Sequence, residues 1–157
     1  MTVYLALKYF HVVGAAVLLG TGAGIAFFML LAHLRRDPAL IAGVAGIVVT
    51  ADFLFTATAV IVQPITGVLL ARSLGYSLWE GWIFWSIVLY AVTGSFWLPV
   101  VWMQMRMRDL ARDAALGSQP LPGRYHQLFW LWFAFGFPAF GAVLLILWLM
   151  IAKPALG

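Results

Sequence analysis

A lysine and a histidine lie one helical turn apart near the start of a very long apolar run. Lys8 and His11 belong to the segment Val3-Tyr-Leu-Ala-Leu-Lys-Tyr-Phe-His-Val-Val-Gly14. An ionisable side chain facing hydrocarbon is costly, so such a pair marks a candidate functional site. Imidazole is an axial ligand of haem iron, and we predict that His11 holds a cofactor. The alternative is a structural histidine that is hydrogen-bonded to a neighbouring helix.

Small residues accompany His11 on the predicted helix. At 100° per residue, one stripe of this helix holds eight residues. They are Tyr4, Lys8, His11, Ala15, Leu18, Gly22, Ile25 and Met29. Gly14, Ala15 and Gly22 leave room for a flat macrocycle beside the histidine, as in helix bundles that hold haem. We therefore predict a haem b site formed by these three residues, by Lys8, and by His11 as the iron ligand.

The two faces of this helix are expected to differ. Ala16, Gly20 and Gly24 form a small-xxx-small row on the face opposite His11, and such rows suit close helix packing. We therefore expect this row to be packed and the His11 stripe to be open. Lys8 would extend toward the membrane interface, where its ammonium group can pair with a haem propionate.

Three further side chains are weaker candidates for a metal. His33 lies 22 residues beyond His11, roughly 33 Å along a straight helix, so the two cannot bind one metal. His33 and His126 are expected as solvated residues at a membrane boundary, with a second haem between them as a weaker alternative. Met150 in the fourth span is a candidate for the sixth iron ligand, and water is another candidate. The alternative role of Met150 is structural, because methionine commonly fills gaps between helices.

Composition indicates an integral membrane protein. Hydrophobic residues make up 65% of the 157 residues and charged residues 9%, too few to cover a water-soluble domain. The sequence has no cysteine, which excludes disulfides, thiolate metal sites and cysteine nucleophiles. The formal charge of +4 reflects arginines that set orientation in the bilayer, and we infer no nucleic-acid partner from it.

Four apolar spans predict an all-α fold, a bundle of four transmembrane helices that forms a single integral membrane domain over residues 1–157. The spans cover about 3–32, 40–71, 82–104 and 128–152, each with the roughly 20 residues that a spanning helix needs. Six of the nine basic residues lie in the first and third breaks between spans. The positive-inside rule therefore places these breaks in the cytoplasm and both termini outside.

Three local signals refine the predicted helices. Asp37-Pro38 is a favourable helix start, because proline at the first helical position gives up no useful donor. Charged residues at helical spacing follow the third span, so we expect a short cytoplasmic helical extension that ends near Gly117. Gln63-Pro64 is expected to kink the second helix and to free a carbonyl that a neighbouring side chain must satisfy.

Asp52 is the one acidic residue within the four predicted spans. It could lie deep in the membrane or near the cytoplasmic edge, because the second span is longer than the hydrocarbon layer. Three threonines are close to it in sequence: Thr50, Thr56 and Thr58. Proton transfer is one possible role for this group. The expected role is an ion pair at the membrane edge with an arginine such as Arg35, Arg106 or Arg124.

The whole chain resembles an uncharacterised bacterial family of four-helix integral membrane proteins, the domain-of-unknown-function family 2269. The residues that carry the likeness are Leu7-Lys-Tyr-Phe-His-Val-Val-Gly14, Leu19-Gly-Thr-Gly-Ala-Gly24, Gln63-Pro-Ile-Thr-Gly67, Trp97-Leu-Pro-Val100, Arg106-Met-Arg-Asp109 and Arg124-Tyr-His126. The resemblance implies a multi-pass protein of the bacterial inner membrane. It implies no particular activity.

The chain is also similar, more distantly, to the HemJ-type protoporphyrinogen IX oxidases, which are haem b proteins, and to the copper-resistance D-type membrane proteins. The matching residues are Lys8, His11 and His33 in the first span, Thr66-Gly67 in the second and Pro138 in the last. This likeness implies that His11 ligates haem. The oxidases carry a histidine and a lysine shortly after a tryptophan in the third span, where this chain has Ile83-Phe-Trp-Ser86 after Trp82. The likeness therefore supports a shared scaffold more than a shared reaction.

These observations predict a membrane haem b protein with an electron-transfer or oxidoreductase role. One alternative is a non-enzymatic accessory subunit of a larger membrane complex, whose glycine and aromatic faces dock other helices. Another is copper handling, with His11 and nearby methionines as soft ligands. The expected partners are the lipid bilayer, a quinone or a redox protein, and either further copies of this chain or a larger complex.

Overall fold

The computed structural model describes residues 2–156, and their secondary structure is entirely helical. Helix α1 spans Thr2–Arg35, α4 spans Gly81–Leu116 and α5 spans Gly123–Ala152. Between α1 and α4, one continuous rod is built from α2 (Pro38–Ala51), the π-helical turn η1 (Asp52–Thr56) and α3 (Ala57–Ser73). This rod and the three helices α1, α4 and α5, called here the four rods, are each long and apolar enough to cross a membrane. The prediction of an all-α bundle with four transmembrane helices is confirmed.

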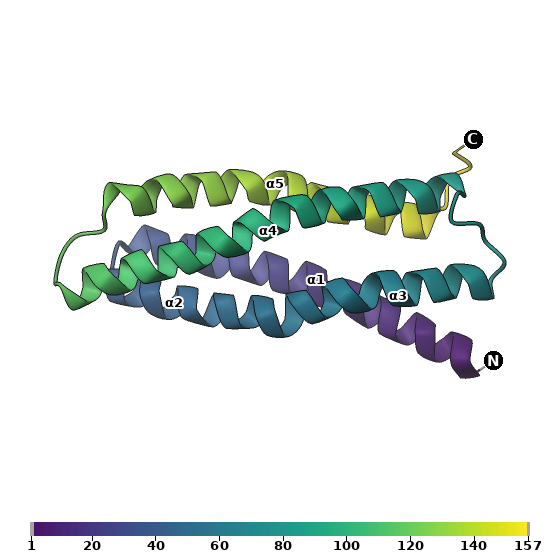
Figure 1. Cartoon of the computed structure of the whole chain (residues 1–157), viewed down its shortest axis with the longest axis horizontal. Coiled ribbons are helices and arrows are strands. Elements are labelled where there is room, and N and C mark those ends of the chain that lie inside the picture. Colours follow the sequence, from purple (N-terminus) through teal and green to yellow (C-terminus); the bar gives the residue numbers. More distant parts are fainter. Residues whose placement is uncertain (1, 157) are drawn as a thin grey trace.

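The two ends of the bundle carry different connections (Figure 1). Thr2, Leu156 and the loop between α3 and α4 lie at one end, called here the terminal end. The connections α1–α2 and α4–α5 lie at the other, called here the arginine end. The arginine end takes its name from six residues, Arg35, Arg36, Arg106, Arg108, Arg112 and Arg124. That the terminal end faces outside stays a prediction.

The main core lies in the half of the bundle nearer the arginine end. All four rods contribute buried side chains to it, among them Met29 of α1, Ile41 of α2, Met107 of α4 and Phe129 of α5, none of which has any exposed surface. A smaller apolar cluster around Trp82 lies at the terminal end. Nearer that end, the rods pack mainly in two pairs, α1 with α3 and α4 with α5. The residues around His11 are thus positioned by α3 rather than by the main core.

The predicted helix boundaries agree with the structure. The Asp37 carboxylate accepts hydrogen bonds from the backbone N–H groups of Ala39 and Leu40, at 2.9 and 3.4 Å, and so caps α2. Helix α4 continues beyond the third apolar span as far as Leu116, and Gly117 follows it. Both the helix start at Asp37-Pro38 and the extension after the third span are confirmed.

Pro64 has the predicted effect on a carbonyl group. A proline inside a helix leaves the carbonyl four residues earlier without its usual N–H partner, and for Pro64 this is the carbonyl of Val60. The Tyr90 hydroxyl of α4 donates a hydrogen bond to that Val60 oxygen. The helix itself remains α-helical through Pro64. The departure from α-helical geometry lies earlier in the rod, at η1, and was not predicted.

Candidate functional site

His11 is attached to α3 by two hydrogen bonds. Its Nδ1 atom lies 2.9 Å from Oγ1 of Thr66. The side-chain Nε2 of Gln63 donates to the backbone carbonyl of His11 at 2.9 Å. Gln63 and Thr66 are both buried, and His11 is partly buried. The ring and the backbone of His11 are therefore both oriented by the helix that packs against it.

The hydroxyl of Thr66 lies within bonding distance of three groups: His11 Nδ1 at 2.9 Å, and the carbonyls of Val62 and Gln63 at 2.8 and 3.2 Å. A hydroxyl has one proton to donate, so when that proton is directed to its own helix, Thr66 accepts from His11 and the ring proton is on Nδ1. Neutral imidazole with Nδ1 protonated presents Nε2 as an unprotonated nitrogen, the form that ligates a metal.

Two glycines allow this close packing of α1 and α3. A Cβ atom at Gly67 would lie 3.2 Å from Cε1 of His11, and a Cβ atom at Gly14 would lie 3.1 Å from Nε2 of Gln63. Both distances are shorter than ordinary carbon contacts. Gly14 thus makes room for the Gln63 side chain, and Gly67 makes room for the imidazole ring. The role predicted for Gly14, to admit a flat macrocycle, is not the role it has in this packing.

The expected difference between the two faces of α1 is not found. Within the His11 stripe, expected to be open, Ile25 and Met29 are buried, whereas Lys8 is exposed. Ala16 and Gly20, expected to be packed, are exposed, and a Cβ atom at Gly20 would meet no atom within 4 Å. The prediction was wrong because a row of small residues permits a close neighbour but does not identify which neighbour is present.

The remaining predicted cofactor residues are not gathered around the His11 ring. Lys8 is exposed, and its Nζ lies 6.0 Å from the centre of the Tyr4 ring. A Cβ atom at Gly22 would meet nothing within 4 Å, and Ala15 is half-buried. Met150 packs against the small apolar cluster around Trp82, which does not include His11. Of the residues predicted for the haem site, His11 is therefore the one whose orientation hydrogen bonds to a neighbouring helix define.

His33 lies in an aromatic cluster at the arginine end. Its ring is parallel to that of Phe129, with 3.6 Å between ring centres, and its Nδ1 lies 3.3 Å from the hydroxyl of Tyr125. Phe129 and Tyr125 are fully buried. His126 is exposed, as predicted, and meets the His33 ring edge-on at 5.6 Å. His33 is partly exposed, and its ring also packs in the contact between α1 and α5, which was not predicted.

Asp52 is buried in the middle of its membrane-spanning rod, with 3% of its surface exposed. Its Oδ1 accepts a hydrogen bond of 3.4 Å from the indole N–H of Trp97 on α4. The expected ion pair with an arginine is absent, since among residues 2–156 the one ion pair joins Arg108 and Asp109. Arg108, which lines a groove together with Ala51 and Leu54, pairs with Asp109 instead.

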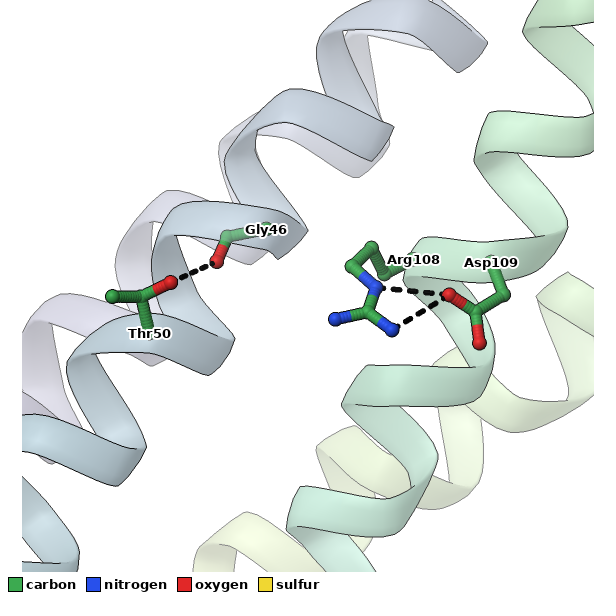
Figure 2. Close-up of polar contacts among 4 residues, drawn as sticks. All are labelled: Gly46, Thr50, Arg108 and Asp109. Atoms are coloured by element: carbon green, nitrogen blue, oxygen red, sulfur yellow. Dashed lines mark hydrogen bonds and ion pairs between the residues drawn. The ribbon is translucent and has the colours of Figure 1, made fainter.

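A groove lies between α2 and α4 toward the arginine end. Small residues of α2, including Gly43 and Gly46, line one wall, and Arg108 and Arg112 of α4 line the other. Figure 2 shows the polar contacts already made there: the Thr50 hydroxyl donates to the Gly46 carbonyl at 3.0 Å, and Arg108 pairs with Asp109 at 2.8 Å. None of the predicted cofactor residues borders this groove.

The described residues do not form a metal site of several ligands. Across residues 2–156, no three His, Cys, Asp or Glu side chains are grouped closely enough to hold one ion. In haem the porphyrin supplies four of the iron ligands and the protein supplies one or two, so a single histidine is enough to ligate it.

Comparison with known proteins yields a family and no activity. The model of the family described as "Predicted integral membrane protein (DUF2269)" matches residues 5–154. No curated protein and no solved structure matches the chain. The matched region includes His11 and Asp52 together with the residues that contact them. The description states location in a membrane but names no cofactor, substrate or partner, so a function has to be argued from the site itself.

Proposed function

The chain belongs to the DUF2269 family of integral membrane proteins, and from that premise we propose that it is a haem b protein of the membrane with an electron-transfer or oxidoreductase role. The observation that carries this proposal is the bond between His11 Nδ1 and Thr66 Oγ1, which leaves Nε2 available as an axial ligand. Metal-ligating histidines usually donate their other ring N–H to a protein acceptor in this way.

The residues around His11 suit one axial ligand. Gln63 and Thr66 hold the backbone and ring of His11 from one side, and Gly67 supports the ring at Cε1 without a side chain of its own. Ligand orientation of this kind lowers the entropy lost on binding. When bound, haem would supply one-electron redox chemistry, with a potential set by its axial ligands and by burial.

Lys8 is proposed to bind an anionic group at the membrane interface. It lies one helical turn before His11, nearer the terminal end, and its ammonium group is exposed beside the Tyr4 ring. A lysine in this position can extend to the interface while its stem stays in the apolar layer. A haem propionate is the anion that the proposed function would bring there.

The deciding experiment is a reduced-minus-oxidised visible spectrum of the detergent-purified full-length protein, expressed with ample haem. We expect a b-type spectrum from the unsubstituted protein and its complete loss in His11→Ala. His33→Ala is the matched control, because it removes a histidine from the same helix whose ring is packed against Phe129. This control is expected to retain the spectrum.

A colourless unsubstituted protein that is correctly folded would contradict the haem proposal. A spectrum that survives in His11→Ala but is lost in His33→Ala would move the ligand to the arginine end. Metal analysis of the same preparation distinguishes copper from haem, since copper would be stoichiometric without a haem spectrum.

A second function is favoured by the exposed row on α1. Ala16 and Gly20 are exposed, a Cβ atom at Gly20 would meet no atom of the described residues within 4 Å, and small-xxx-small rows allow close approach of another membrane helix. This observation favours an accessory subunit that docks a larger complex or a second copy of the chain. Co-purification in mild detergent, compared between the unsubstituted protein and Gly20→Leu, tests it directly. Loss of a co-purifying protein in the variant supports the docking role.

The setting of the proposed function is the bacterial inner membrane, with the terminal end outside. The distribution of arginines supports this orientation, because cytoplasmic loops carry the excess of basic residues. A haem held by His11 would then lie toward the outer leaflet, within reach of a quinone or of an external redox protein. Reporter fusions at the C-terminus, scored for an outside or inside location, test the orientation.

A further inference from the structure

A group of buried polar side chains surrounds Asp52 in the middle of the membrane-spanning region. Asp52, Thr56 and Gln104 are 3%, 7% and 1% exposed, and Trp97 completes the group from α4. Thr56, Trp97 and Gln104 lie beside the Asp52 carboxyl group. Burial of this many polar groups in hydrocarbon is costly and marks a functional site by default.

Three oxygen atoms of this group have no hydrogen-bond partner among the described residues. They are Oδ2 of Asp52, Oγ1 of Thr56 and Oε1 of Gln104. The indole N–H of Trp97 satisfies only the other carboxylate oxygen, Oδ1. Buried polar atoms are almost always paired. Thr56 can donate its own proton to the carboxylate beside it, but the Gln104 oxygen and the remaining lone pairs of the carboxylate still point to a further positive or donor group.

Thr56 differs from the other threonines of its rod. The hydroxyls of Thr50, Thr58 and Thr66 each donate to the carbonyl four residues earlier. The hydroxyl of Thr56 makes no such bond, and it lies in the π-helical turn η1 together with the buried acid. Turns of this kind are frequent at functional sites.

We propose that Asp52, Thr56 and Gln104 form an intramembrane site for one monovalent cation, taken up as Na⁺ or as a proton. Carboxylate, amide and hydroxyl oxygens are hard ligands of the kind that alkali cations and protons prefer. A single positive charge would also neutralise a carboxylate that has no ion-pair partner among the described residues. Arg108 of α4 lies one helical turn beyond Gln104, lines the groove beside Ala51 and Leu54, and pairs with Asp109. In the part of the chain that the structure describes, no lysine, arginine or histidine pairs with Asp52.

The site is independent of the His11 region. Asp52 and Thr56 are on η1, and Asp52 bonds to Trp97 of α4, whereas His11 is bonded to Thr66 on α3. A failure of the haem proposal therefore leaves the cation proposal unaffected. Trp97 donates to the carboxylate and is a positioning residue for it rather than a ligand, since an indole N–H cannot bind a cation.

The test compares unfolding temperatures of the full-length protein in detergent in NaCl and in choline chloride of equal ionic strength. A ligand that binds only the folded state raises this temperature with the logarithm of its concentration. We expect a rise of about 2–4 °C when Na⁺ exceeds its Kd several-fold, and a smaller rise at lower pH, where protons compete. Asp52→Asn is expected to abolish the Na⁺ response.

The matched control is Asp109→Asn, which removes an acid that is partly exposed and paired with Arg108. It is expected to keep the full Na⁺ response. Gln104→Leu is the second variant, which reduces the response without touching the acid. Should Asp52→Asn fail to fold, direct binding of radioactive Na⁺ to the unsubstituted protein and to Gln104→Leu decides the question.

Infrared spectroscopy separates the two cations. If the occupant is a proton, the unsubstituted protein shows no Na⁺ response, and a protonated carboxyl band at pH 7 is present that Asp52→Asn lacks. If the occupant is Na⁺, the Na⁺ response is present and the band appears only at lower pH. The proposal is overturned if neither the response nor the band is found, or if both persist in Asp52→Asn.

Discussion

His11 and His33 lie on the same helix and are held by the same kind of bond, yet they have different surroundings. Each Nδ1 lies beside a hydroxyl, at 2.9 Å from Thr66 and at 3.3 Å from Tyr125. The His33 ring is stacked on Phe129 within the main core, whereas the His11 ring meets Gly67 outside it. A hydroxyl partner orients a histidine, but the contacts of the ring decide whether it serves packing or binding.

This contrast extends to the two ends of the bundle. The main core, with its largest buried side chains, lies toward the arginine end, whereas helix pairs and a small apolar cluster hold the terminal end. Regions with fewer buried contacts open more readily and are where binding sites are commonly found. Substitutions near His33 should therefore act mainly on stability, and substitutions near His11 mainly on ligand binding.

The largest expected effect on stability is that of Phe129→Ala. Phe129 is fully buried and contacts His33, Tyr125 and Trp132, so its removal leaves a cavity where α1 meets α5. We expect a loss of about 3 kcal/mol, the lower part of the range for buried phenylalanine, because lipid already solvates apolar surface in the unpacked state. The measurement is reversible unfolding in mixed micelles. Phe137→Ala, on the same helix but 66% exposed, is the control and should change little.

A smaller effect is expected for Gly67→Leu, which tests the contact between α3 and the His11 ring. A Cβ atom there already lies 3.2 Å from Cε1 of His11, so a leucine must push α1 and α3 apart. Overpacking of this kind costs about 1–3 kcal/mol. Gly20→Leu adds the same side chain to α1 where no atom lies within 4 Å, and it should alter stability by less than about 0.5 kcal/mol. Equal losses in the two variants would contradict the assignment of packed and exposed faces.

The sequence was sufficient to predict the architecture because the determinants are local. Apolar runs define the four rods, Asp37 caps α2, and Pro64 identifies in advance the carbonyl that Tyr90 satisfies. The faces of α1 could not be assigned in the same way. In a bilayer both faces of a helix are apolar, so hydrophobic periodicity does not separate the side that meets protein from the side that meets lipid.

The partners of His11 were predictable from depth, although this signal was not used. His11 lies nine residues after the first residue of α1, and Thr66 lies seven residues before the last residue of α3. At 1.5 Å per residue the two are at about the same depth, roughly 10–14 Å from the terminal end. Polar side chains at one depth in a membrane tend to bond to each other. The position of Thr56 in a π-helical turn was not predictable, because that turn has no sequence signature.

The next prediction compares His33→Ala with His11→Ala in one unfolding assay. Loss of His33 removes a stacked ring pair and a hydrogen bond to Tyr125, and we expect a cost of about 1–2 kcal/mol. Loss of His11 removes one hydrogen bond, worth about 0.6 kcal/mol in a membrane. The spectra of the two variants should show the opposite order, with haem lost only in His11→Ala. If stability and spectrum are lost together in either variant, the division between packing and binding is wrong.

The smallest expected change in stability is that of Thr66→Val, which preserves shape and removes the hydroxyl that accepts from His11 Nδ1. The fold should lose about 0.6 kcal/mol or less, the average value of one hydrogen bond between membrane helices. Thr58→Val is the matched control, because its exposed hydroxyl bonds only to the Leu54 carbonyl of its own rod. The two variants should therefore be nearly equal in stability.

The two variants should differ in ligand binding, since loss of the partner that orients a metal-ligating histidine typically weakens binding by about 10–100-fold. A haem titration of the apoprotein measures this difference, and equal affinities in Thr66→Val and Thr58→Val would show that the hydroxyl serves helix packing alone.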